Sequence, residues 1–112
     1  MNTHDIWRLS ATELSTLTRA GDVSAETAVQ ASIERMNGVN PDLNAVVEDL
    51  SAEALNRARE LDKARAAGAA PGPLQGVPVT IKINVDQQGH ATSNGVTALK
   101  DLIAPGDAPV VA

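Results

Sequence analysis

Lys82 is the residue of this sequence best placed for acid–base chemistry, because it interrupts an apolar run. Residues 77–85 alternate between β-branched side chains and Pro, Thr, Lys or Asn, which is the period-2 pattern of a β-strand. In that register Lys82 shares a face with Thr80 and Asn84. Burial disfavours the charged form of a lysine, so a buried lysine at this place would act as a general base.

The alternative interpretation of Lys82 is structural. Most strand lysines lie on solvated faces, and a lysine at a sheet edge opposes aggregation. Ser93 is a candidate nucleophile, but no base lies beside it in sequence, and a turn role is favoured. His4 and His90 are far apart and have no companions at metal-ligand spacing, so we predict no metal site.

The composition excludes several classes of function. The formal net charge is −5 and the basic residues are dispersed, which argues against a nucleic-acid or anionic-membrane surface. The sequence has no cysteine, and therefore neither a disulfide framework nor a thiol nucleophile. The first residues lack a signal-peptide pattern, and no apolar run is long enough to span a bilayer. We expect a soluble, cytoplasmic protein.

Helices must precede the lysine segment and position it. Ser10 and Glu13 form a capping box at the start of the first helix, and Ser24 is the expected N-cap of the second. We predict helices at about 11–20, 25–37 and 51–67, and the lysine-bearing strand at about 77–85.

Weaker signals predict shorter elements. Residues 43–48 are short and β-branched, as in a strand, and residues 96–102 suggest a short helix. Asp107 has the position of an N-cap, with Pro109 in the first turn of a further helix.

The lysine segment and its surroundings resemble the amidase signature family. The stretch that carries the resemblance is Gly72-Pro-Leu-Gln-Gly-Val-Pro-Val-Thr-Ile-Lys82-Ile-Asn84-Val-Asp86, followed by Gly89 and by Thr92-Ser-Asn-Gly95. Matching segments occur upstream at 9–14, 21–24 and 40–45, and downstream at 107–111. The family usually has Asp directly after the lysine, where this chain has Ile83.

This resemblance implies an α/β fold in which helices are followed by strands of a mixed central sheet. Residues 1–112 are then the N-terminal segment of a single larger amidase domain. The implied activity is amide hydrolysis by a Ser–cisSer–Lys triad that needs no cofactor. Lys82 matches the catalytic lysine, and the two serines are expected beyond Ala112. The 112 residues alone are therefore predicted to be inactive.

Two alternatives stay open at this stage. Within the family, the chain would belong to a subunit of a tRNA-dependent amidotransferase, which hydrolyses glutamine and passes ammonia to a partner. In another class, it would be a non-enzymatic helical interaction segment with Lys82 on its surface.

The expected partner is a small-molecule amide, without direct contact to nucleic acid or membrane. Trp7 is the only aromatic residue, so a core built from this chain alone would be thin. An isolated central strand would also expose bare edges. We therefore expect marginal stability, and association with the missing C-terminal remainder or with a second copy.

Overall fold

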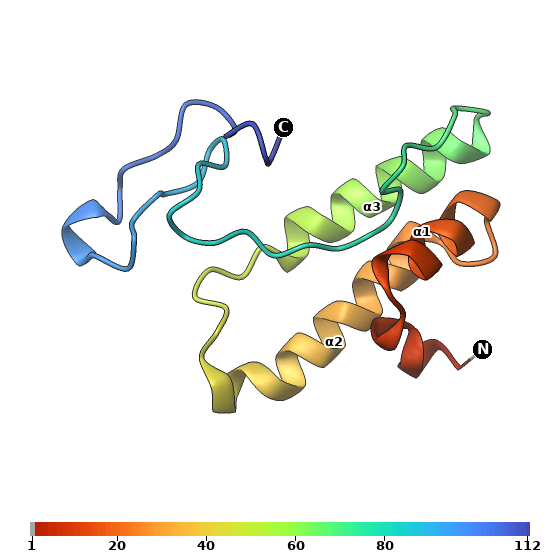
Figure 1. Ribbon diagram of the computed structural model, residues 1–112, viewed down its shortest axis with the longest axis horizontal. Helices are drawn as coiled ribbons and strands as arrows, with labels where there is room; N and C mark the ends of the chain where they lie inside the picture. The colour runs from red at the N-terminus through yellow and green to blue at the C-terminus, as the bar shows by residue number, and fades with distance from the viewer. Residues whose placement is uncertain (1) are drawn as a thin grey trace. The chain divides into compact units, whose positions relative to one another are not determined.

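The computed structural model describes residues 2–112, which divide after Pro78 into two compact units. Unit 1 ends at Pro78 and contains most of the helical structure, and unit 2 covers Val79–Ala112. Figure 1 shows the elements along the chain. In order they are η1 (Thr3–Arg8), α1 (Ala11–Ala20), α2 (Ala25–Leu43), α3 (Ser51–Ala66) and η2 (Thr97–Leu99).

Helix α1 has the bounds that its capping signals predict. The Ser10 hydroxyl accepts the backbone N–H of Glu13 at 3.2 Å, and the Glu13 carboxylate accepts the backbone N–H of Ser10 at 2.8 Å. Two hydrogen bonds to the Glu13 carboxylate lower the pKa of Glu13. The larger effect comes from the Ser10 hydroxyl and the smaller from the Ser10 backbone N–H. Gly21 closes the helix in the left-handed conformation at φ 88°, as a C-terminal glycine does.

Helix α2 is longer than its sequence pattern predicts. We expected it to end at residue 37, before Gly38, but it continues to Leu43 with Pro41 inside it. A proline inside a helix removes one backbone hydrogen bond, and a glycine lowers helix propensity by about 1 kcal/mol. The helix nevertheless continues through both residues.

Asn40 holds the chain that follows α2. Its side-chain oxygen accepts the backbone N–H groups of Ala45 at 2.9 Å and Val46 at 2.8 Å, and its amide donates to the Val46 carbonyl at 2.9 Å. Asn44 caps the helix in the left-handed conformation at φ 49°. These bonds use the backbone groups that a strand would need for pairing, and the strand predicted at 43–48 is wrong.

Helix α3 confirms the predicted third helix, to within one residue of the expected end. The Asp49 carboxylate accepts the backbone N–H of Ser51 at 2.9 Å at its start. Hydrogen bonds from the Ser51 hydroxyl and backbone lower the pKa of Asp49. Of the α3 residues, only Ala58 is buried, so the helix contributes a narrow contact face.

The apolar core of unit 1 consists of two small clusters built mostly from alanine and aliphatic residues. Helix α2 contributes to both clusters, and Figure 1 shows α3 running alongside it. Because the side chains at the contacts are short, the helices can approach closely. The first cluster contains Ile6, Leu14, Ala28 and Ala31, and the second contains Ala25, Val29 and Ala58.

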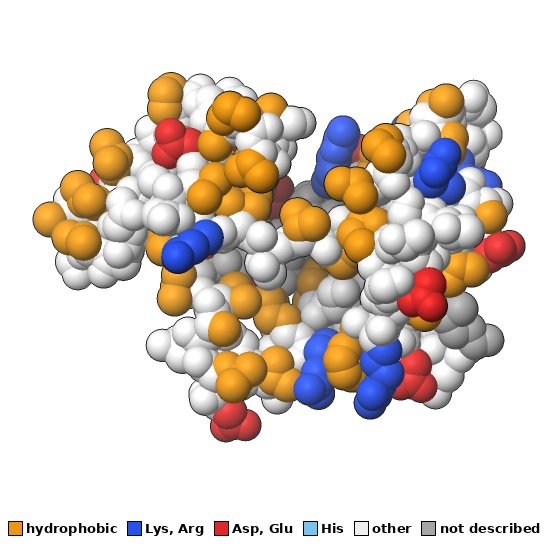
Figure 2. All heavy atoms as spheres, in the orientation of Figure 1, with side chains coloured by type: hydrophobic (Ala, Val, Ile, Leu, Met, Phe, Trp, Pro, Cys, Tyr) orange, Lys and Arg blue, Asp and Glu red, His pale blue; other side chains and the backbone are white. Residues whose placement is uncertain are grey.

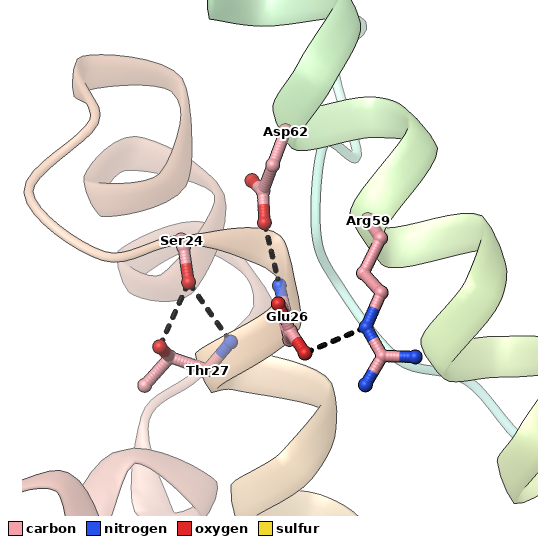
Figure 3. Close-up of polar contacts among 5 residues, drawn as sticks. All are labelled: Ser24, Glu26, Thr27, Arg59 and Asp62. Carbon is pink, nitrogen blue, oxygen red and sulfur yellow. Dashed lines mark hydrogen bonds and ion pairs between the residues drawn. The ribbon is translucent and has the colours of Figure 1, made fainter.

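Two side chains of α3 reach the first turn of α2 (Figure 3). The Asp62 carboxylate accepts the backbone N–H groups of Ala25 at 2.8 Å and Glu26 at 2.9 Å. Arg59 donates to the Glu26 carboxylate at 2.7 Å. Free N–H groups and the positive end of the helix dipole favour a carboxylate at this place. Asp62 therefore caps α2 in addition to the local cap, Ser24.

The predicted mixed sheet is wrong for the part of the chain that the structure describes. Residues 2–112 contain no strand, and the only β-pairing in this range is an isolated antiparallel bridge between Ala91 and Ile103. The segment predicted as a strand at 77–85 pairs with no other segment, and its backbone turns where Val85 donates to the Lys82 carbonyl at 2.9 Å. An alternating pattern specifies the two faces of a strand, but a strand also needs backbone partners.

Unit 2 departs from prediction at its other elements too. The helix expected at 96–102 shrinks to the three residues of η2. The helix predicted after Asp107 is wrong. The Asp107 carboxylate accepts the backbone N–H of Gln88 at 2.8 Å instead of capping a helix. The carboxylate therefore ties together two loops of the unit.

Apolar side chains remain on the surface of unit 2. Ala104 is its one buried apolar residue in the described range, whereas Val79 is 72% and Val110 84% exposed. Hydrophobic side chains also gather on the molecular face that Figure 2 draws. None of the helices within residues 2–112 combines the length and the hydropathy needed to cross a bilayer.

Replacing Asp62 by alanine should lower the free energy of unfolding by about 2 kcal/mol, because two N–H groups of α2 lose a charged acceptor. Glu60→Ala is the matched control, on the same helix and with the same change in charge. Glu60 pairs with Arg57 while both are mostly exposed, so its loss should cost at most about 0.5 kcal/mol. Urea denaturation followed by circular dichroism measures both. Equal losses would contradict the capping role.

Candidate active site

Lys82 lies at the start of a turn and is exposed. The predicted alternation of exposed and less exposed side chains is present around Lys82. Thr80 and Asn84 are also exposed, while Ile81 and Ile83 are half-buried. Among residues 2–112 no carboxylate forms an ion pair with Lys82. The described residues therefore present the lysine on an open polar face and leave its side chain uncovered.

Asp86 anchors the turn that carries Lys82. Thr92 donates its hydroxyl to the Asp86 carboxylate at 2.5 Å, and the backbone N–H of Ala108 donates to the Asp86 carbonyl at 2.9 Å. A short hydrogen bond from a hydroxyl to a carboxylate is among the stronger kinds in proteins. Residues from three parts of unit 2 thus converge immediately after the lysine turn.

The other predicted positions do not gather around Lys82. Ser93 accepts the backbone N–H of Gly95 at 3.3 Å, which confirms its role in a turn. His4 lies at the exposed start of η1. No group of three or more His, Cys, Asp or Glu side chains suited to a metal ion occurs within residues 2–112.

Sequence reasoning missed two hydroxyl groups of α1 that hold the loop ahead of the lysine segment. Ser15 donates to the Pro73 carbonyl at 2.6 Å, and Thr18 donates to the Gln75 carbonyl. Both hydroxyl residues are buried. Their spacing of three residues, on the helical face that also carries Leu14, was the available signal.

Gly76 lets this loop lie directly against the helices. Its φ is +69°, and an added Cβ would lie 2.9 Å from the Thr18 methyl and 3.1 Å from the Ala25 Cα. Both the conformation and the close approach exclude a side chain. The loop is therefore fixed on unit 1 six residues before Lys82 in the sequence.

One hollow of unit 1 also contains titratable side chains. It has a volume of about 420 Å³ and is lined by η1 and α2, including His4, Glu26 and Glu34. Its carboxylates already have partners, since Arg59 binds Glu26 and Gln30 donates to Glu34 at 3.0 Å. Both carboxylates of the hollow are therefore already held by neighbouring side chains.

Comparison with known proteins gives a consistent result. The family model described as Amidase matches residues 27–112. The indoleacetamide hydrolase of Bradyrhizobium diazoefficiens is 54% identical over 106 residues, which are 95% of this chain and 20% of that protein. The acylamidase of Rhodococcus erythropolis is 36% identical over 99% of this chain and 23% of its own length.

An amidotransferase is also similar. A glutamyl-tRNA(Gln) amidotransferase subunit of Carboxydothermus hydrogenoformans is 37% identical over 96% of this chain and 22% of its own length. The chain thus spans about a fifth of the length of these curated relatives.

Replacing Thr18 by valine should loosen the loop at 72–77, because valine keeps the branched shape but cannot donate to the Gln75 carbonyl. The free energy of unfolding should fall by about 1–3 kcal/mol, which is the cost of leaving a buried acceptor unpaired. Thr16→Val is the control, since the exposed Thr16 hydroxyl donates to the Thr12 carbonyl of the same helix. Hydrogen exchange of residues 72–77 should accelerate in the first variant alone. Unchanged exchange there would contradict the anchoring role.

Proposed function

The chain belongs to the amidase family, and from this membership we propose that it is the N-terminal segment of a single larger domain that hydrolyses amide bonds. The observation that carries the proposal is the family match over residues 27–112, which includes Lys82. The 54% identity to an indoleacetamide hydrolase supports it further. A purely non-enzymatic helical segment has no comparable support.

Lys82 is the proposed base of a Ser–cisSer–Lys triad whose serines lie outside residues 1–112. One serine oxygen attacks the amide carbonyl and forms an acyl-enzyme, while the second serine passes the proton to the neutral lysine. Backbone N–H groups stabilise the oxyanion. The proton then leaves with the nitrogen as ammonia or an amine, and water hydrolyses the ester to a carboxylic acid. No cofactor takes part.

The proposed substrate is a small-molecule amide, and indoleacetamide is the first compound to assay. The name of the relative with 54% identity supports this choice. The amidotransferase alternative has weaker support, at 37% identity. Indoleacetamide hydrolysis by the purified full-length protein in the absence of other chains would support the amidase. Glutamine hydrolysis that depends on a partner supports the alternative.

The surroundings that this mechanism requires are proposed to come from the remainder of a full-length enzyme. A general base accepts a proton in its neutral form, and burial disfavours the charged form of an amine, so covering of the exposed Lys82 is part of the proposal. The exposed apolar residues of unit 2, such as Val79 and Val110, favour association with that remainder. The cytoplasmic location expected from the sequence stays a prediction.

In the full-length protein, replacing Lys82 by alanine should lower kcat/KM for the amide by about 10⁴-fold or more, because members of a triad act as a unit. The fold should be unchanged. Lys100→Ala, which removes another exposed lysine of unit 2, is the matched control and should retain activity. Steady-state kinetics with circular dichroism test both variants. A Lys82 variant that keeps most of its activity would refute the assignment.

Thr92 should matter for the same reaction by fixing Asp86 beside the lysine turn. Thr92→Val removes the hydroxyl that donates to Asp86 and should lower kcat by about tenfold to a hundredfold, as small misplacements of catalytic groups do. Thr92→Ser keeps the hydroxyl and should restore most of kcat. Equal activities of the two variants would show that the hydrogen bond does not position Lys82.

A further inference from the structure

The chain contains the dipeptide Asn-Gly twice, in two different backbone environments. Asn37-Gly38 lies inside α2, and Asn94-Gly95 lies in a turn of unit 2. We propose that Asn94 is a site of spontaneous deamidation through a cyclic imide, and that the helix protects Asn37 from the same reaction. This inference does not depend on the proposed amidase activity.

The reaction requires only the two residues, water and a base from the solvent. The backbone nitrogen of Gly95 loses its proton and attacks the Asn94 Cγ. A C–N bond forms, the Cγ–Nδ2 bond breaks, and the side-chain nitrogen leaves as ammonia. Water then opens the five-membered imide at either carbonyl, giving aspartate or its β-linked isomer. Glycine favours the attack because it has no Cβ beside the nitrogen.

The geometry at Asn94 leaves the attacking nitrogen accessible. Asn94 and Gly95 are both exposed and both have positive φ, 52° and 74°. The backbone N–H of Gly95 donates to the Ser93 hydroxyl at 3.3 Å, which is longer than a typical hydrogen bond. A Cβ added at Gly95 would meet nothing within 4 Å. Solvent base can therefore reach this N–H.

Asn37 provides a comparison within the same molecule. It is exposed like Asn94, and a Cβ added at Gly38 would also meet nothing within 4 Å. The difference is the backbone, because a helix binds the N–H of Gly38 in its i→i−4 series and fixes the torsion angles around it. The reaction at Asn37 must wait for local opening of the helix, which lowers its rate.

Modification of Asn94 would have a physical effect on unit 2. It makes the protein one charge more negative, and the β-linked product adds a backbone carbon to the turn. This turn follows the hydrogen bond from the Thr92 N–H to the Leu102 carbonyl. Because Ala104 is the unit's one buried apolar residue in the described range, little packing opposes the rearrangement.

The test is to incubate the purified native protein at mildly alkaline pH and to quantify aspartate and isoaspartate at both sites by peptide mapping. The product at Asn94 should form about tenfold faster than the product at Asn37, or faster still, because local opening limits the helical site. In concentrated urea the two rates should become equal. Equal native rates, or faster reaction at Asn37, would overturn the proposal.

A second measurement tests the cause. Hydrogen exchange should be fast at the Gly95 amide and protected at the Gly38 amide under the same conditions. The variant Asn94→Ser should lose the unit 2 product while the rate at Asn37 stays unchanged. If the Gly95 amide exchanges as slowly as the Gly38 amide, the accessibility argument fails.

Discussion

Close packing against the first two turns of α2 is the constraint on which unit 1 depends. Ala25 is 1% and Ala28 0% exposed, and each belongs to a different apolar cluster. A Cβ added at Gly76 would lie 3.1 Å from the Ala25 Cα of α2 and 2.9 Å from the Thr18 methyl of α1. A chain with a single aromatic residue thus forms an interior by bringing backbones together, where larger rings would otherwise fill the space.

Backbone carbonyl and N–H groups at the helix ends and in the loop at 72–77 need hydrogen-bond partners, and side chains from distant segments supply them. Asp62 accepts the first N–H groups of α2, and Arg65 donates to the Ala20 carbonyl at the end of α1 at 2.7 Å. Thr18 donates to a carbonyl 57 residues away in sequence. Each such bond has a modest net value of about 1 kcal/mol, but together they define how the helices and the loop at 72–77 are joined.

Sequence reasoning succeeded where the signal was local and failed where it was not. The capping box of Ser10 and Glu13 lies within one turn, and α1 was predicted correctly. The end of α2 was predicted wrongly because the rule applied there ends a helix at a glycine, in this case Gly38. That rule does not consider Asn40, which binds backbone groups up to six residues ahead. Residues 77–85 have the alternation of a strand but no pairing partner among residues 2–112. The family motif predicts a role for Lys82, which stays a prediction, whereas the roles of Ser15 and Thr18 depend on contacts distant in sequence.

The two units differ in how completely they cover their side chains, and this difference bears on the chemistry proposed for Lys82. Unit 1 satisfies its polar groups internally: within residues 2–112 no buried side-chain nitrogen or oxygen lacks a hydrogen-bond partner. Unit 2 holds the lysine turn through Asp86 and Thr92, yet it leaves the lysine and several aliphatic side chains in water. A proton acceptor needs a desolvated amine, and apolar surface favours burial. A surface that covered both the lysine and these aliphatic side chains would meet both demands.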